Sequence, residues 1–99
     1  MLPKMSLPNT ELNSENIRKI EDEILLICRH CKTLDELKSA GVSVWEWASA
    51  VLNTSPDEFR GEVELHSMDE RFPDKFSEEK DHLLKIPIIL LERLHNPNI

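Results

Sequence analysis

The chain contains few of the residues that mark sheet-rich or phosphate-binding enzymes. Only two of its 99 residues are glycine, tyrosine is absent, and two Trp and three Phe are its only aromatic side chains. Long Val-rich alternating stretches are also scarce, which favours helices over strands. Neither a Gly-rich phosphate loop nor an HExxH zinc motif occurs. The sequence therefore predicts a helical protein that is not an enzyme and that carries no cofactor.

Long hydrophobic runs are missing as well. The longest, residues 86–91, is interrupted by Pro87 and is far too short to cross a bilayer. Residues 1–8 contain no apolar run that would serve as a signal peptide. Two cysteines, Cys28 and Cys31, do not make a disulfide framework. We therefore expect a cytoplasmic protein with reduced thiols and no membrane association.

Positive charge is in deficit, because 12 Lys and Arg oppose 19 Asp and Glu, a formal net charge of −7. Binding to a nucleic-acid backbone or to an anionic membrane requires a basic surface, so the charge argues against both. Acidic residues concentrate between Asp57 and Glu79. They predict either a docking surface for a basic protein or a solvated face that aids solubility, and the second use is the more common one.

The beginning of the chain is predicted to be a flexible tail followed by one helical domain. Pro and Asn residues punctuate residues 1–13, and little there can be buried, whereas residues 14–96 show helical periodicity. Ser14 predicts the start of a first helix that runs to about Cys31. Its apolar side chains recur at spacings of three and four, which indicates a core-facing stripe: Ile17, Ile20, Ile24, Ile27 and Cys31.

Two short helices are predicted next. Thr33 with Glu36, and Ser43 with Glu46, both fit the capping-box pattern of a helix start. Gly41 lies between them and suits the left-handed conformation that ends many helices. We therefore expect the chain to break at Gly41.

The remaining chain is predicted to contain one or two further helices. Ser55 followed by Pro56 is a start signal, and Ser77 predicts the start of the last helix. Pro87 lacks an amide hydrogen and would clash with the carbonyl of Leu83, so we expect a kink or a restart there. The predicted fold class is all-α, a compact bundle of four to five short helices with a disordered N-terminal tail.

Residues 33–53 resemble the helix-turn-helix of LacI-type and phage-repressor-type regulators, in which Gly-Val-Ser separates a leucine-bearing helix from a recognition helix. Gly41, Val42 and Ser43 match the turn. The resemblance implies a DNA-binding transcriptional regulator. The chain departs from the pattern because Leu37 replaces a small residue and because no Arg, Lys, Gln or Asn stands at the front of the second helix. The alternative is an ordinary corner between two bundle helices.

The cysteine pair and the four histidines are the residue types in this chain that most often carry metal or acid–base chemistry. The spacing of Cys28 and Cys31 suits metal ligands, but no second Cys or His pair occurs at ligand spacing. We therefore interpret both as core residues and predict no metal site. The four histidines are scattered, and none has a nearby Ser or Cys with an obvious third orienting group in sequence, so no catalytic residue is predicted.

Two features suggest that the chain binds another protein. Trp45 and Trp47 lie about 200° apart around a helix, so we expect Trp47 to be core and Trp45 to be partly exposed at an interface. Residues 83–94 are apolar nearly all round, which predicts a homodimer, a site for a different partner, or a fully internal helix. The predicted partner-binding residues are Trp45, Glu46, Ser49, Ile88 and Leu91.

The function that these patterns favour is a small acidic intracellular protein–protein interaction module, such as an adaptor, an inhibitor or an immunity-type regulator. The alternative is the helix-turn-helix DNA-binding regulator.

Overall fold

A stripe of isoleucines builds the first helix, α1 (Ser14–His30), and its members Ile17, Ile20, Ile24 and Ile27 are all buried. The computed structural model describes residues 7–65 and 76–96, and within these ranges all regular structure is helical, as predicted. Three helices follow α1, namely α2 (Leu34–Leu52), α3 (Pro56–Leu65) and α4 (Ser77–His95). Pro73 also predicts a loop at residues 71–76, and His66 is expected to be partly buried; both positions lie outside the described residues, apart from Phe76.

The caps of α1 differ by one residue from those predicted. Asn13, rather than Ser14, is the N-cap, and its Oδ1 accepts a hydrogen bond from the backbone amide of Asn16 at 2.8 Å. An Asx side chain is as effective a cap as serine. The helix ends at His30, close to the predicted end, with basic residues in its last turn, where they suit the helix dipole.

The predicted break at Gly41 is wrong, because α2 continues through it without interruption. Thr33 is confirmed as an N-cap, since its Oγ1 accepts from the amide of Glu36 at 3.1 Å, while the Glu36 carboxylate accepts from Thr33 Oγ1 at 3.2 Å. The second predicted capping box, at Ser43, is not a helix start, because Ser43 lies in the middle of α2. Gly41 does not adopt a positive φ.

Gly41 packs against α4, in a space that would also accept a methyl group. A Cβ atom built on Gly41 would lie 3.5 Å from Leu83 Cδ2, so the two helices approach each other closely there. The left-handed residue that ends α2 is instead Asn53 at φ 54°, whose amide donates to the carbonyl of Ala50 at 3.2 Å. Asn is the residue that most readily replaces glycine in this conformation.

The start of α3 is confirmed and that of α4 is shifted. Ser55 Oγ accepts from the amide of Glu58 at 3.2 Å, and Pro56 is the first helical residue. For α4, Ser77 is the first helical residue and Phe76 is the N-cap, in a left-handed conformation at φ 63°. The helix continues through Pro87, so the predicted restart there is wrong.

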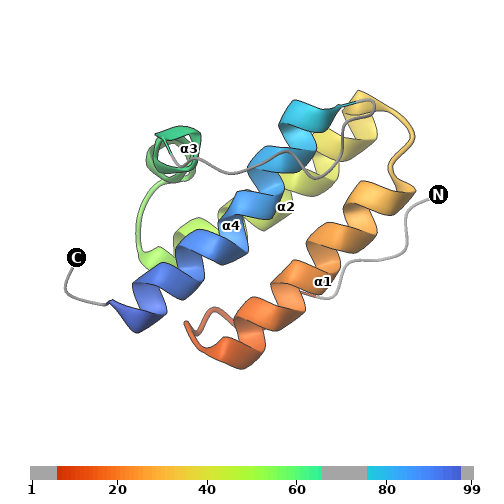
Figure 1. Cartoon of the computed structure of the whole chain (residues 1–99). Coiled ribbons are helices and arrows are strands. Elements are labelled where there is room, and N and C mark those ends of the chain that lie inside the picture. Colours follow the sequence, from red (N-terminus) through yellow and green to blue (C-terminus); the bar gives the residue numbers. More distant parts are fainter. Residues whose placement is uncertain (1–6, 66–75, 97–99) are drawn as a thin grey trace.

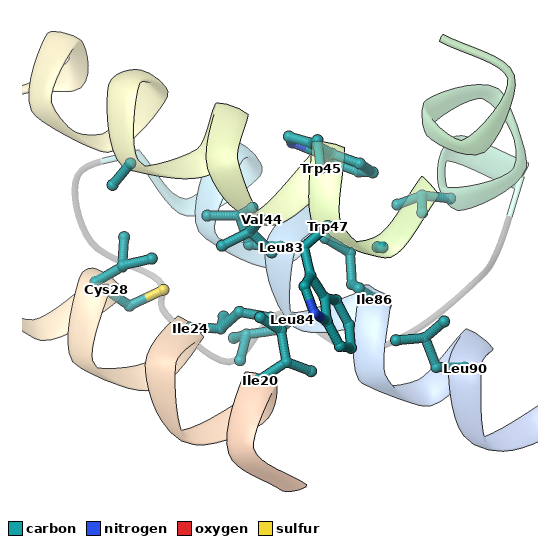
Figure 2. Close-up of a cluster of buried hydrophobic side chains, with 14 of the residues drawn as sticks. Ile20, Ile24, Cys28, Val44, Trp45, Trp47, Leu83, Leu84, Ile86 and Leu90 are labelled. Carbon is teal, nitrogen blue, oxygen red and sulfur yellow. The ribbon is translucent and has the colours of Figure 1, made fainter. Parts of the chain in front are cut away.

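Helix α4 packs against all three other helices, while α3 packs against α2 and α4. Figure 1 shows α1, α2 and α4 lying alongside one another, with α1 running opposite to the other two and α3 viewed almost end-on. The core lies where these three long helices face each other (Figure 2), and its largest fully buried side chains include Phe59, Ile20, Ile24, Leu37, Leu84, Ile86, Ile89 and Leu90.

Candidate interaction site

Trp45 is buried rather than partly exposed, with only 5% of its surface accessible, so that prediction is wrong. Its ring packs edge-on against Phe59 of α3, with ring centroids 5.6 Å apart and planes inclined by 70°. The guanidinium carbon of Arg60 lies 5.1 Å from the centroid of the indole ring. Helix α3 therefore covers the side of α2 that the sequence assigned to a partner, and Figure 2 shows Trp45 and Trp47 on different sides of α2.

The other predicted residues of α2 do not join Trp45 in one surface. Ser49 is buried, and its hydroxyl donates to the carbonyl of Trp45 at 2.8 Å and to that of Glu46 at 3.0 Å. Both bonds stay within the helix, and the side chain does not reach the surface. Of the three predicted residues of α2, Glu46 alone is exposed, beside Val42 one turn earlier.

Most of the apolar strip at residues 83–94 is internal. Its outward side chains are Ile88, which is half-buried, and Leu91, which is 37% exposed. The side chains that face the core are Leu83, Leu84, Ile86, Ile89 and Leu90.

At the end of this strip, α3 and α4 form a surface hollow of about 450 Å³. It is lined by Glu62, Glu92, Arg93 and Asn96, and we call it the α3–α4 edge. Arg93 Nη2 donates to Glu62 Oε1 and so joins the two helices across the hollow. The lining includes two carboxylates and one guanidinium. Leu91 precedes the hollow on α4, and Leu65, the last residue of α3, is 88% exposed.

The segment before α1, which the sequence predicts to be a flexible tail, packs against the helices in its described part, residues 7–13. Trp47 Nε1 donates to the carbonyls of Pro8 at 3.0 Å and Asn9 at 3.3 Å. Asn16 Nδ2 donates to the carbonyls of Asn9 at 3.2 Å and Glu11 at 2.8 Å, and also to Asn9 Oδ1. The side chains of Leu7 and Leu12 pack against the core. The sequence did not indicate a role for Asn16. A buried indole N–H requires a hydrogen-bond acceptor, so Trp47 did indicate that another part of the chain would lie against it.

The two cysteines are buried core residues, and neither forms a disulfide. Burial raises the pKa of the Cys31 thiol above its ordinary value of 9.0; the negative charge of Glu36 adds to the rise, and Lys80 opposes it. A thiol with a raised pKa is a poor nucleophile and a poor metal ligand at neutral pH. Within residues 7–65 and 76–96, no group of three His, Cys, Asp or Glu side chains could hold a metal ion.

Two buried charges on α4 form an ion pair one helical turn apart. Lys85 Nζ lies 3.5 Å from Asp81 Oδ2, and both side chains are almost fully buried. The second oxygen, Asp81 Oδ1, has no hydrogen-bond partner. A buried pair of this kind fixes side-chain orientation more than it adds stability.

No helix in the described part of the chain is both long enough and apolar enough to span a membrane. No family model, no curated protein and no solved structure matches the sequence or the fold.

Proposed function

We propose that the chain is a small acidic protein–protein interaction module, of the adaptor, inhibitor or immunity type, that binds a basic partner protein through the α3–α4 edge. The observation that carries this proposal is the acidic exposed surface of α3, which carries Asp57, Glu58 and Glu64 on the helix that forms one wall of the hollow. The hollow itself is lined by Glu62, Glu92, Arg93 and Asn96.

A lysine or arginine of the partner suits this hollow for electrostatic reasons. The bond between Arg93 and Glu62 holds the two helices in place, so the lining is arranged before the partner arrives. Leu91, exposed beside Glu92, offers the apolar contact that interfaces combine with a polar rim. Complementary charge of this kind mainly speeds association and makes it sensitive to salt.

Site-directed variants of the whole chain test the proposal. The wild-type chain is used to capture proteins from an extract of its source cell, and the main captured protein is identified, purified and titrated calorimetrically at two salt concentrations. We expect Glu92→Arg to weaken binding by about tenfold, since it reverses a charge at the rim. Asp22→Arg makes the same charge change on the exposed surface of α1 and serves as the matched control.

The control separates a site from a general charge effect. If both variants weaken binding equally, the partner responds only to net charge and the α3–α4 edge is not the site. If neither does, the partner binds elsewhere.

The DNA-binding alternative for residues 33–53 predicts affinity for duplex DNA that falls steeply with salt. The same titration measures this with a duplex in place of the partner. An intracellular location is part of this proposal and is consistent with two cysteines that form no disulfide.

A further inference from the structure

The surface formed by Trp47 and Asn16 binds the segment before α1 in the way that a recognition domain binds a peptide. All its hydrogen bonds to residues 8–11 run from side-chain donors of the helices to carbonyl oxygens of the segment. Three of these acceptors, in Pro8, Asn9 and Glu11, are main-chain carbonyls. Main-chain contacts of this kind supply affinity for an extended peptide, and side-chain anchors supply specificity.

Both donor side chains depend on an occupant. Trp47 and Asn16 are each only 5% exposed. If residues 7–12 left this surface empty, these donors and the apolar side chains under Leu7 and Leu12 would lose their partners together. With the segment gone, the two donors would bond to water instead, and the apolar surface under the two leucines would be exposed, which favours an occupied surface over an empty one.

The present occupant can leave without unfolding a helix. Residues 7–12 contain no helix or strand, and the side chains of Asn9, Thr10 and Glu11 are exposed. Leu7 and Leu12, the two anchors, are only half-buried. The segment joins α1 at the cap residue Asn13, where the chain is extended at φ −149° and ψ 165°.

We infer that the surface of Trp47 and Asn16 is a second binding site, for an extended peptide of a partner protein, which residues 7–12 occupy as a built-in competitor. The peptide it fits has a leucine followed by proline, a second leucine four residues after the proline, and free carbonyls between them, as Leu7, Pro8 and Leu12 do. Proline suits the position after the first leucine because it favours an extended chain and brings no amide that requires an acceptor. This inference is independent of the α3–α4 edge.

A linked competitor acts at an effective concentration of the order of millimolar, so it hides the site from weak ligands. The test therefore uses the full-length chain with the competitor weakened by Leu7→Asp and Leu12→Asp. The probe is a fluorescein-labelled peptide of residues 7–12, LPNTEL, and binding is followed by fluorescence anisotropy. We expect the double variant to bind the probe at least about tenfold more tightly than the wild-type chain does.

Two controls establish that the site is the one described. A probe with both leucines replaced by aspartate should not bind. Adding Asn16→Asp to the double variant should weaken binding at least about tenfold, because the carboxylate has no N–H to donate, while an acidic residue in the first turn of α1 favours the helix. Equal affinity of the wild-type chain and the double variant, or no binding by a double variant whose circular dichroism is that of a folded chain, would overturn the inference.

A measurement on the wild-type chain keeps the inference testable if the double variant does not fold. Hydrogen exchange of the Trp47 indole N–H, followed by NMR, reports departure of the segment, and the amide of Ile24 reports opening of the core. We expect the indole to exchange at least about tenfold faster, since a detachable segment opens locally. Equal protection would mean that the segment leaves only on global unfolding, which would overturn the inference.

A wild-type dimer that is abolished by Leu7→Asp and Leu12→Asp would also overturn the inference. It would indicate instead that two copies exchange this segment.

Discussion

At the scale of single residues, Trp45 and Trp47 show how α2 is covered on two sides. Trp47 donates its indole N–H to the segment before α1, and Trp45 packs against Phe59 of α3. We expect Trp45→Ala to lower the free energy of unfolding by about 3–5 kcal/mol, because it leaves a cavity that α3 cannot fill. Glu46→Ala, at the exposed neighbouring position, should change it by less than about 0.5 kcal/mol. Urea denaturation followed by circular dichroism measures both; a small loss for Trp45→Ala would mean that α3 does not cover this ring.

A second residue-scale prediction concerns the Cys31 thiol. Its pKa is raised first by burial and then by Glu36, so the native state favours the neutral thiol. With a folded pKa above the unfolded one, its contribution to stability is fully present below the unfolded pKa and is lost as the pH rises through the folded pKa. In a Cys28→Ala background, Cys31 should therefore react with a thiol reagent at least about tenfold more slowly in the folded chain than in urea.

The pH dependence is measured by difference, because other groups also titrate in alkali. The free energy of unfolding of Cys28→Ala should fall more between about pH 8 and about pH 10 than that of the variant that also carries Cys31→Ala. Equal slopes for the two variants would show that the Cys31 thiol ionises as easily in the folded chain as in the unfolded one.

At the scale of elements, the continuity of α2 predicts how replacing Gly41 changes the free energy of unfolding. Replacing a glycine that caps a helix would lower it, whereas replacing a glycine inside a helix should raise it. Gly41 lies inside a helix without a positive φ, and an added Cβ would make ordinary contacts with Leu83 at 3.5 and 3.7 Å. We expect Gly41→Ala to raise the free energy of unfolding by about 0.5–1 kcal/mol. Gly61→Ala, inside α3 with nothing within 4 Å, is the matched control and should give a similar rise. Destabilisation by Gly41→Ala alone would indicate a break at that residue.

The helix starts were predictable because their signals are local. Thr33 and Ser55 each cap the helix that follows them, through a hydroxyl and an amide three residues apart. The false break at Gly41 arose from signals of the same kind, but packing of Leu83 against α2 decides the outcome there, and Leu83 is 42 positions away in the sequence. Likewise, the buried side of Trp45 depends on α3 folding back over α2, which no local pattern encodes.

At the scale of the whole molecule, the predicted homodimer through residues 83–94 has fewer outward apolar side chains than the sequence indicated. Ile88 and Leu91 remain at the surface, whereas an interface of standard size buries about 800 Å² per partner. We expect sedimentation equilibrium at micromolar concentration to give a monomer. We also expect Leu91→Glu to change the free energy of unfolding by less than about 0.5 kcal/mol. A dimer that Leu91→Glu dissociates would confirm self-association through this strip.

The candidate sites were less predictable than the fold. The acidic character of the α3–α4 edge follows from composition. The hollow itself exists because α3 lies beside the end of α4. The ion pair that joins the two helices links Glu62 to Arg93, 31 positions apart, which no local pattern predicts. The site at Trp47 and Asn16 was missed because Pro and Asn residues ahead of α1 are typical of a tail. Three of its four acceptors are main-chain carbonyls, which every residue has, so no side-chain pattern indicates them.

The central place of α4 has a consequence for how the protein is made. Helix α4 contacts each of the other three, yet it follows all of them in the chain. On the ribosome, the inward faces of α1, α2 and α3 therefore emerge before the helix that covers them. Until Ser77–His95 has left the exit tunnel, the nascent chain exposes isoleucines and leucines to chaperones and proteases. A product of interrupted translation that lacks α4 exposes the same side chains permanently. Burial of these side chains thus distinguishes a chain in which α4 has been made and has docked from one that lacks it.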